Sequence, residues 1–173
     1  KKTRGVIQYG IFKGMTINHY ESTWGGRTIT SKLLGHYERQ VSNHLVYMFK
    51  TNKNKTFYNF GAADGYYSIG VLYSKLADKS INFEENKKAH DIIKKNANIN
   101  LCENQIKIYN KITKQKILIA LEKIGKPGVL LCDVEGYEFN LFDKNIFNKL
   151  NHTHIIIEIH KFNKNFLQLK KKL

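Results

Sequence analysis

The sequence predicts an α/β fold: a Rossmann-like, doubly wound and mostly parallel sheet with helices on both faces. Three observations lead to this class. Apolar stretches of strand length alternate with amphipathic stretches of helix length, the order expected of a parallel sheet covered by helices. A turn of small residues, 61–65 (GAADG), joins the first apolar stretch to a helix. Glu84 ends the second apolar stretch about 20 residues farther on, as in nucleotide-binding βαβ units.

The composition is that of one globular domain. The chain has 173 residues, of which 42% are hydrophobic and 12% aromatic, enough for one full core and too few for two confident domains. Its apolar runs have strand length, so no membrane span is expected. Cys102 and Cys132 show neither metal-binding nor redox spacing. Two unpaired thiols favour a reducing compartment, and we expect a cytoplasmic protein.

The net charge of +15 has two explanations. Clustered positive charge attracts the phosphates of nucleic acids. The charge comes, however, from 26 lysines and only three arginines, in a chain that also has 18 asparagines and 20 isoleucines. Arginine supplies the bidentate contacts that read bases and grip phosphates, whereas Lys, Asn and Ile increase together in AT-rich coding sequences. A nucleic-acid partner therefore stays open but is not favoured.

The first part of the chain is expected to form an N-terminal cap, 1–55, on the substrate side of a core, 56–173. Residues 5–17 carry three glycines and alternate loosely, which is typical of an irregular hairpin. Over 30–50, apolar side chains recur at helical spacing, and we predict one amphipathic helix there. The polar stretch 51–55 (TNKNK) then separates the cap from the core.

The core shows the alternation of strands and helices most clearly. Residues 56–84 are predicted to form a strand, the small-residue turn, a helix and a second strand. Further strands are predicted at 105–109, 129–133 and 154–160, and further helices at 85–99 and 114–124. Only 13 residues follow the fifth strand, too few for the antiparallel hairpin that closes such sheets, so this final hairpin is expected to be missing.

Polar residues collect where the strands are predicted to end. In open α/β sheets the ligand lies beyond the carboxyl ends of the strands, where the strand order reverses. With the first, fourth and fifth strands as neighbours about 4.8 Å apart, Gly61, Asp133 and Glu158 end close together. Glu158 and His160 are two residues apart and so share one face of a strand. Each residue alone has an ordinary structural explanation; their common edge indicates a site.

On these motifs the sequence resembles the FkbM-type family of S-adenosylmethionine-dependent methyltransferases, which have class I, Rossmann-like architecture. The resemblance covers roughly residues 35–160. It rests on five stretches: 59–68 (NFGAADGYYS), 83–86 (FEEN), 96–100 (NANIN), 133–138 (DVEGYE) and 158–160 (EIH). Two positions depart from the family pattern, because Glu85 stands where Pro is usual and Asn59 stands where an acid is common.

The resemblance implies methyl transfer from S-adenosylmethionine to a hydroxyl of a sugar or another natural-product-like small molecule. It also implies the residues that contact the cofactor: Gly61, Ala62, Ala63, Asp64, Gly65, Tyr66, Glu84, Asn110 and Asp133. Glu84 would accept the ribose hydroxyls, Asn110 would meet the adenine edge, and the ammonium of the amino-acid tail would lie near Asp64 or the strand-end carbonyls.

The residues near the fourth and fifth strand ends are expected to carry the reaction. His160 is the candidate general base because the ordinary pKa of histidine lies near neutrality. Asp133 and Glu135 are expected to orient His160 or to contact the acceptor.

Three alternatives stay open. Asp133 and Glu158 could hold a divalent metal that acidifies the hydroxyl, but two carboxylates are too few for us to expect one. An RNA methyltransferase would use the positive charge, yet the chain shows no nucleic-acid-binding module. A non-catalytic binding protein could be built on a decayed methyltransferase fold, since fold does not determine function. The sequence names neither the acceptor nor the oligomeric state.

Overall fold

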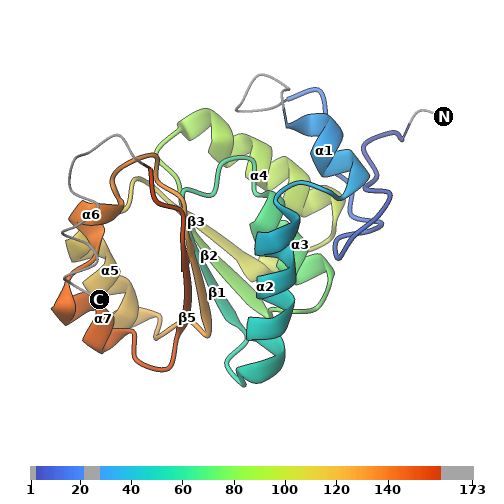
Figure 1. Cartoon of the computed structure of the whole chain (residues 1–173). Helices are drawn as coiled ribbons and strands as arrows, with labels where there is room; N and C mark the ends of the chain where they lie inside the picture. Colours follow the sequence, from blue (N-terminus) through green and yellow to red (C-terminus); the bar gives the residue numbers. More distant parts are fainter. Residues whose placement is uncertain (1–2, 22–27, 161–173) are drawn as a thin grey trace.

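Five strands form one parallel sheet in the order β3-β2-β1-β4-β5 (Figure 1). The computed structural model describes residues 3–21 and 28–160 of the chain. The strands are β1 (Thr56–Phe60), β2 (Lys79–Phe83), β3 (Ile106–Tyr109), β4 (Val129–Cys132) and β5 (His154–Ile157). The chain moves outward from β1 to β3 and then returns to the opposite side of β1, so the strand order reverses between β1 and β4. The predicted Rossmann-like parallel sheet is confirmed.

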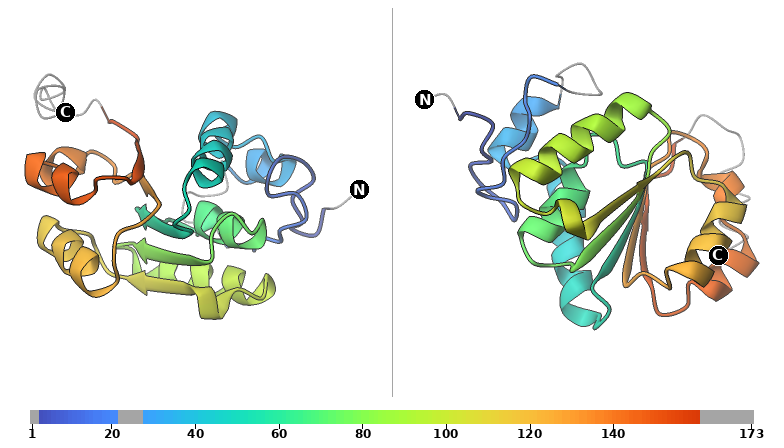
Figure 2. Two further views of the ribbon diagram at one scale, coloured as in Figure 1. Left: turned by 90° about the horizontal axis from the view of Figure 1, so that it is seen from below. Right: turned by 180° about the vertical axis from the view of Figure 1, so that it is seen from behind.

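Helices cover both faces of the sheet. They are α1 (Ile29–Leu34), α2 (Arg39–Thr51), α3 (Tyr66–Tyr73), α4 (Lys87–Ile99), α5 (Lys114–Lys123), α6 (Glu138–Leu141), α7 (Lys144–Lys149) and a 3-10 turn, η1 (Glu103–Gln105). Helices α2, α3 and α4 lie on one face, and α5, α6 and α7 lie on the other (Figure 2). Among the described residues, no helix is long and apolar enough to cross a membrane.

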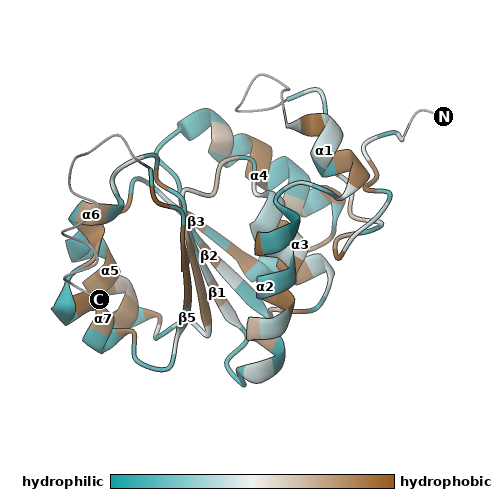
Figure 3. Ribbon diagram, viewed as in Figure 1, coloured by the Kyte–Doolittle hydropathy of each residue, from teal (hydrophilic) through white to brown (hydrophobic). Residues whose placement is uncertain are grey.

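Each central strand divides its side chains between two cores. Along β1, Phe57 packs into the core shared with α2 and α3, whereas Tyr58 and Phe60 pack into the core shared with α5 and α7. All five residues of β1 are buried. Figure 3 shows hydrophobic residues gathered on the strands and on the helix surfaces beside them. Burial on both faces explains why β4 is a continuous apolar run, whereas the edge strand β3 alternates between partly buried and exposed residues.

The N-terminal segment packs against the same core as α2 and α3. Within 5–17 an antiparallel bridge joins Val6 and Thr16, which fits the predicted irregular hairpin. Phe12 and Met15 are fully buried in that core. The division of the chain into a cap and a core stays a prediction.

The single helix predicted over 30–50 is wrong, because the structure has two helices there. Gly35 ends α1 with φ +70°, and Glu38 precedes α2 with φ +39°. Left-handed residues cannot continue a right-handed helix, so the chain turns between them. The turn directs α1 toward the carboxyl end of the sheet, where Lys32, the buried residue of this helix, meets the 61–65 turn.

Strand β5 ends at Ile157, earlier than predicted. Glu158 still donates its backbone N–H to the carbonyl of Cys132 at 2.9 Å, but it and His160 follow the strand instead of sharing one of its faces. The expected absence of a final hairpin concerns residues that lie outside the described part of the chain.

Gly61 determines how closely the ends of β1 and β4 approach. Its φ is +82°, and a Cβ there would lie 1.7 Å from the carbonyl oxygen of Asp133. We expect Gly61→Ala to lower the free energy of unfolding by more than the ~1–2 kcal/mol that a left-handed conformation alone costs. Urea denaturation measures this. Gly125→Ala is the control, since Gly125 has φ +102° but no atom within 4 Å of its Cβ; equal losses would exclude the contact with Asp133 as the cause.

Candidate active site

A cleft of about 1100 Å³ opens at the carboxyl ends of the strands. The 61–64 stretch, Glu84, Asp133 and Glu158 line it from the sheet, and α1 and the residues before α2 line it from the other side. This is the edge at which the strand order reverses, where open α/β sheets bind their ligands. Pockets for one small molecule are typically about 300–1,000 Å³, so this cleft is large enough for a ligand of cofactor size.

The small-residue turn is drawn against the end of β2. The N–H groups of Gly61 and Ala62 both donate to the carbonyl of Phe83, at 2.8 and 3.3 Å. Gly61 and Ala63 have positive φ, as does Gly65, which begins α3. Gly65 lies outside the lining of the cleft, because it packs against side chains of the helices instead. The turn therefore presents its first four residues to the cleft.

Glu84 joins this turn to the loop after β2. Its Oε2 accepts a hydrogen bond from the N–H of Ala63 at 2.8 Å, and its Oε1 accepts one from the N–H of Asn86 at 2.8 Å. Each carboxylate oxygen can accept a second hydrogen bond. Because Glu84 also lines the cleft, a diol can bond to it without displacing the backbone.

Asp64 already has a cationic partner within the protein. Lys32 Nζ lies 2.5 Å from its Oδ2, and the N–H of Tyr66 donates to its Oδ1 at 3.3 Å. Lys32 therefore already neutralises the charge of Asp64. This pairing argues against the expected contact between Asp64 and the ammonium of a ligand. Sequence reasoning missed Lys32, since α1 carries no pattern that singles out this lysine.

Two other expected residues can be placed directly. Tyr66 lines the cleft, and its contact with the cofactor stays a prediction. Asn110 is exposed after the edge strand β3 and lies outside the lining, so the expected contact with an adenine edge finds no support. Lys111 and Ile112, which follow it, reach the cleft instead.

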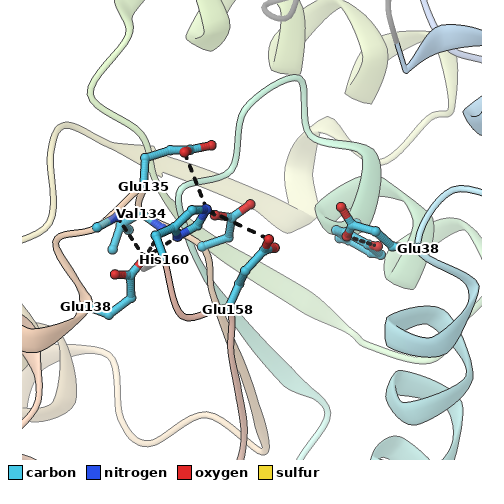
Figure 4. A network of polar contacts seen from close by, with 9 residues as sticks. Glu38, Val134, Glu135, Glu138, Glu158 and His160 are labelled. Carbon is cyan, nitrogen blue, oxygen red and sulfur yellow. Dashed lines mark hydrogen bonds and ion pairs between the residues drawn. The ribbon is translucent and has the colours of Figure 1, made fainter. Parts of the chain in front are cut away.

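His160 lies among four carboxylates (Figure 4). Its Nδ1 donates to Oε1 of Glu138 at 3.0 Å. Its Nε2 lies 3.4 Å from Glu135, 3.7 Å from Asp133 and 3.8 Å from Glu158. We expected Asp133 or Glu135 to orient the ring, but the shortest of these four contacts is with Glu138.

Glu138 is a fully buried carboxylate that organises the loop after β4. Its Oε1 also accepts from the N–H groups of Gly136, at 3.1 Å, and Val134, at 3.4 Å. The loop needs this support because Glu135 and Gly136 both have positive φ. Glu138 belongs to the 133–138 motif, and that motif was the one sequence signal for its importance.

The carboxylates and the imidazole shift one another's pKa. Burial, with the negative charges of Glu158 and Glu135, raises the pKa of Asp133 to about 7. Burial also raises the pKa of Glu158. Burial lowers the pKa of His160, but its hydrogen bond to Glu138 and the charges of Glu135 and Asp133 outweigh this and leave the pKa above its usual value. The cluster can therefore exchange protons near neutral pH.

One oxygen of Asp133, Oδ1, lies 3.7 Å from Nε2 of His160. Within the described residues its buried Oδ1 makes no hydrogen bond. Asp133, Glu135 and Glu158 line the cleft, whereas His160 does not.

Asp133, Glu135 and His160 also lie close enough to share a cation. One potential ligand atom from each lies within 4.8 Å of the others. Asp133 and Glu158 were the pair considered for a divalent ion, but among the described residues Asp133 groups instead with Glu135 and His160. Carboxylate and imidazole ligands suit several divalent ions, and acidic groups also gather without any metal.

Glu38 stands on the opposite wall of the cleft (Figure 4). The hydroxyl of Tyr67 donates to its Oε2 at 2.6 Å. Glu38 falls inside the single helix that the sequence predicted over 30–50. The break between α1 and α2 instead turns it into the cleft with a left-handed backbone.

The cleft is acidic although the chain is basic. Seven of the fourteen Asp and Glu residues line it: Glu38, Asp64, Glu84, Glu85, Asp133, Glu135 and Glu158. The lysines among the described lining residues, Lys32 and Lys111, are each paired with one of these acids. The excess positive charge therefore lies elsewhere on the protein.

No family model and no curated protein matches this sequence. Among solved structures, the chain is similar to an O-methyltransferase from Bacillus cereus in complex with SAH, with 13% identity and a TM-score of 0.51 over 66% of this chain and 53% of that one. It is similar to the O-methyltransferase TomG from Streptomyces achromogenes in complex with SAM, with 9% identity and a TM-score of 0.50 over 67% and 55% of the two chains. It is also similar to the C-terminal domain of precorrin-6Y C5,15-methyltransferase from Rhodobacter capsulatus, with 13% identity and a TM-score of 0.55 over 74% and 66%.

These likenesses define the class of fold. The chain has the Rossmann-like fold of class I methyltransferases, as its sequence predicted. It spans about half the length of the Bacillus and Streptomyces proteins.

Asp133 should make stability depend on pH. Its pKa is about 7 in the folded protein and about 3.9 in an unfolded chain, so the folded state binds more protons between these values and becomes less stable as pH rises through them. We expect Asp133→Asn to melt a few degrees above the parent at pH 8, with a smaller difference at pH 4. Thermal denaturation at both pH values measures this.

Asp143→Asn is the matched control for this measurement. A hydrogen bond from Lys114 lowers the pKa of Asp143, which also caps α7. Its replacement should reduce stability at pH 8, the opposite sign. If Asp133→Asn also melted lower at pH 8, the uncompensated charge of Asp133 would not be a source of instability.

Proposed function

We propose that this chain is an S-adenosylmethionine-dependent O-methyltransferase of the FkbM type that acts on a hydroxyl of a sugar or another natural-product-like small molecule. One observation carries the proposal. The small-residue turn, Glu84 and the acidic cluster around His160 all meet at one cleft, at the point where the strand order reverses. The fold supports a methyltransferase, and the five sequence motifs support the FkbM type.

The residues of the cleft fit such a cofactor. Glu84 offers free acceptor sites for two ribose hydroxyls, and Phe83 and Ile112 give the same part of the cleft apolar surface for a flat base. Asn59, at the end of β1, is 2% exposed and has a buried Oδ1 without a hydrogen-bond partner in the described structure. When bound, the cofactor supplies an electrophilic methyl group on a sulfonium. The rest of the reaction depends on the protein.

The protein must align the acceptor hydroxyl and remove its proton. Asp133 lines the cleft, and its pKa of about 7 suits a base at neutral pH. Nε2 of His160 lies 3.7 Å from Oδ1 of Asp133, and the hydrogen bond to Glu138 orients the His160 ring. We therefore assign Asp133 as the base that contacts the acceptor and His160 as a positioning residue that stabilises its charge. These roles reverse those expected from the sequence.

The acidic lining argues against the alternative of RNA methylation. A phosphate chain entering the cleft would meet Glu38 on one side and Asp133, Glu135 and Glu158 on the other. The phosphates and these carboxylates would repel one another. Each lysine among the described lining residues is already paired with an acidic side chain. A neutral or cationic small acceptor avoids this cost.

Binding tests the role of Glu84. We expect S-adenosylhomocysteine to bind the parent, and Glu84→Ala to weaken binding about 10- to 100-fold, because hydrogen bonds to a charged group are lost. Titration calorimetry measures this. The control is Glu85→Ala, since Glu85 also lines the cleft but is paired with Lys111 at 2.8 Å. No binding heat with folded parent protein would refute the proposed function.

The pH dependence of turnover tests the assignment of the base. With a saturating hydroxyl acceptor found by a cofactor-consumption screen, kcat should rise with pH through about 7, as Asp133 loses its proton. Asp133→Asn should lower kcat about 10²- to 10⁴-fold. In His160→Ala the rising limb should move to higher pH, because the positive charge of His160 lowers the pKa of Asp133. A His160→Ala profile without that limb would make His160 the base.

A further inference from the structure

Lys32 is a buried cation in the wall of the cleft. It is 2% exposed, and its Nζ lies 2.5 Å from Oδ2 of Asp64. The rings of Tyr37 and Tyr66 lie 4.9 and 5.5 Å from the same nitrogen. All four side chains line the cleft. The ammonium is therefore enclosed by one carboxylate, two aromatic rings and the space for a ligand.

This ammonium has more donors than partners. A lysine carries three N–H donors, and within the described residues Lys32 makes one hydrogen bond, to Asp64. Aromatic faces attract a cation but do not replace a full hydrogen bond. Buried polar groups normally find partners. A buried cation with unused donors at the wall of a cleft indicates that an anionic group of the ligand binds there.

The position of Lys32 selects which part of a ligand it can reach. Through Asp64 it is tied to the 61–65 turn, directly after β1. Asn59 precedes the same turn, lines the cleft and has an Oδ1 without a hydrogen-bond partner among the described residues. A cation with spare donors and an amide oxygen with a spare acceptor site thus flank one turn. This pair matches a carboxylate and an ammonium, the two charged groups of an amino acid.

We propose that Lys32 binds the α-carboxylate of the amino-acid tail of S-adenosylmethionine, and that Asn59 Oδ1 accepts from its ammonium. The inference rests on the proposed function and adds two residues to the site. Asp64 then acts as a positioning residue, because it holds Lys32 toward the turn. Helix α1, which the sequence assigned to a substrate-side cap, contributes directly to the cofactor site.

The test compares two nucleosides that differ in this tail. S-adenosylhomocysteine carries the amino-acid group, and 5′-methylthioadenosine lacks it. Calorimetry with the parent should show tighter binding of S-adenosylhomocysteine. Lys32→Met should weaken binding of S-adenosylhomocysteine about 10- to 100-fold and leave 5′-methylthioadenosine within about two-fold, because a charged hydrogen-bond donor to the carboxylate is lost.

A second pair of variants covers the case in which Lys32→Met leaves Asp64 buried without a cationic partner and does not fold. Lys32→Met/Asp64→Asn removes both charges together, and Asp64→Asn alone keeps Lys32. The ratio of the two dissociation constants should collapse in the double variant and persist in Asp64→Asn. A purely structural role of Lys32 would weaken both nucleosides equally and leave the ratio unchanged.

The outcomes distinguish a failure of the role of Lys32 from a failure of the proposed function. A parent that binds both nucleosides, with the same ratio in Lys32→Met or in the double variant, overturns the role of Lys32 and leaves the proposed function standing. A folded parent that binds neither nucleoside overturns the proposed function and this inference with it.

Discussion

The close approach of β1 and β4 is the constraint on which the site depends. Asp133 donates its N–H to the carbonyl of Phe60, the last residue of β1, at 2.9 Å. Gly61 follows β1, and any Cβ there would collide with the Asp133 carbonyl. The chain must therefore leave β1 in a left-handed turn, which folds back onto the end of β2. One backbone contact thus places the small-residue turn, Glu84 and Asp133 around the same cleft.

The site concentrates charges that a stable core would avoid. Glu138 is completely buried, and Asp133 faces the negative charges of Glu158 and Glu135. Buried charges are costly unless hydrogen bonds and opposite charges compensate them. Two backbone N–H groups and His160 compensate Oε1 of Glu138, whereas Oε2 of Glu138 and Oδ1 of Asp133 make no hydrogen bond in the described structure. Such local conflict with stability is typical of functional sites. The same concentration of carboxylates makes the cleft acidic although the chain as a whole is basic.

The sequence predicted features that depend on neighbours along the chain. Strand β4 is a continuous apolar run, the turn at Gly61 needs small residues, and Glu84 ends the stretch of β2 at a characteristic distance from that turn. The errors have a different origin. The break between α1 and α2 was hidden by a helical pattern that continues across Gly35. The contact of Asn110 with an adenine edge stays a prediction, for a residue that is exposed after the edge strand and lies outside the lining of the cleft.

By itself, the sequence determined the fold class and the edge of the sheet where polar residues gather, because periodicity and strand ends are local properties of the chain. The tertiary structure alone decided which polar residues meet. Lys32 contacts Asp64, which lies 32 residues away along the chain, and Glu138 contacts His160, which lies 22 residues away. Only the packing of the folded chain brings each pair together. It also decided the roles, since the pKa of Asp133 depends on burial and on Glu158 and Glu135, which only the folded chain brings together.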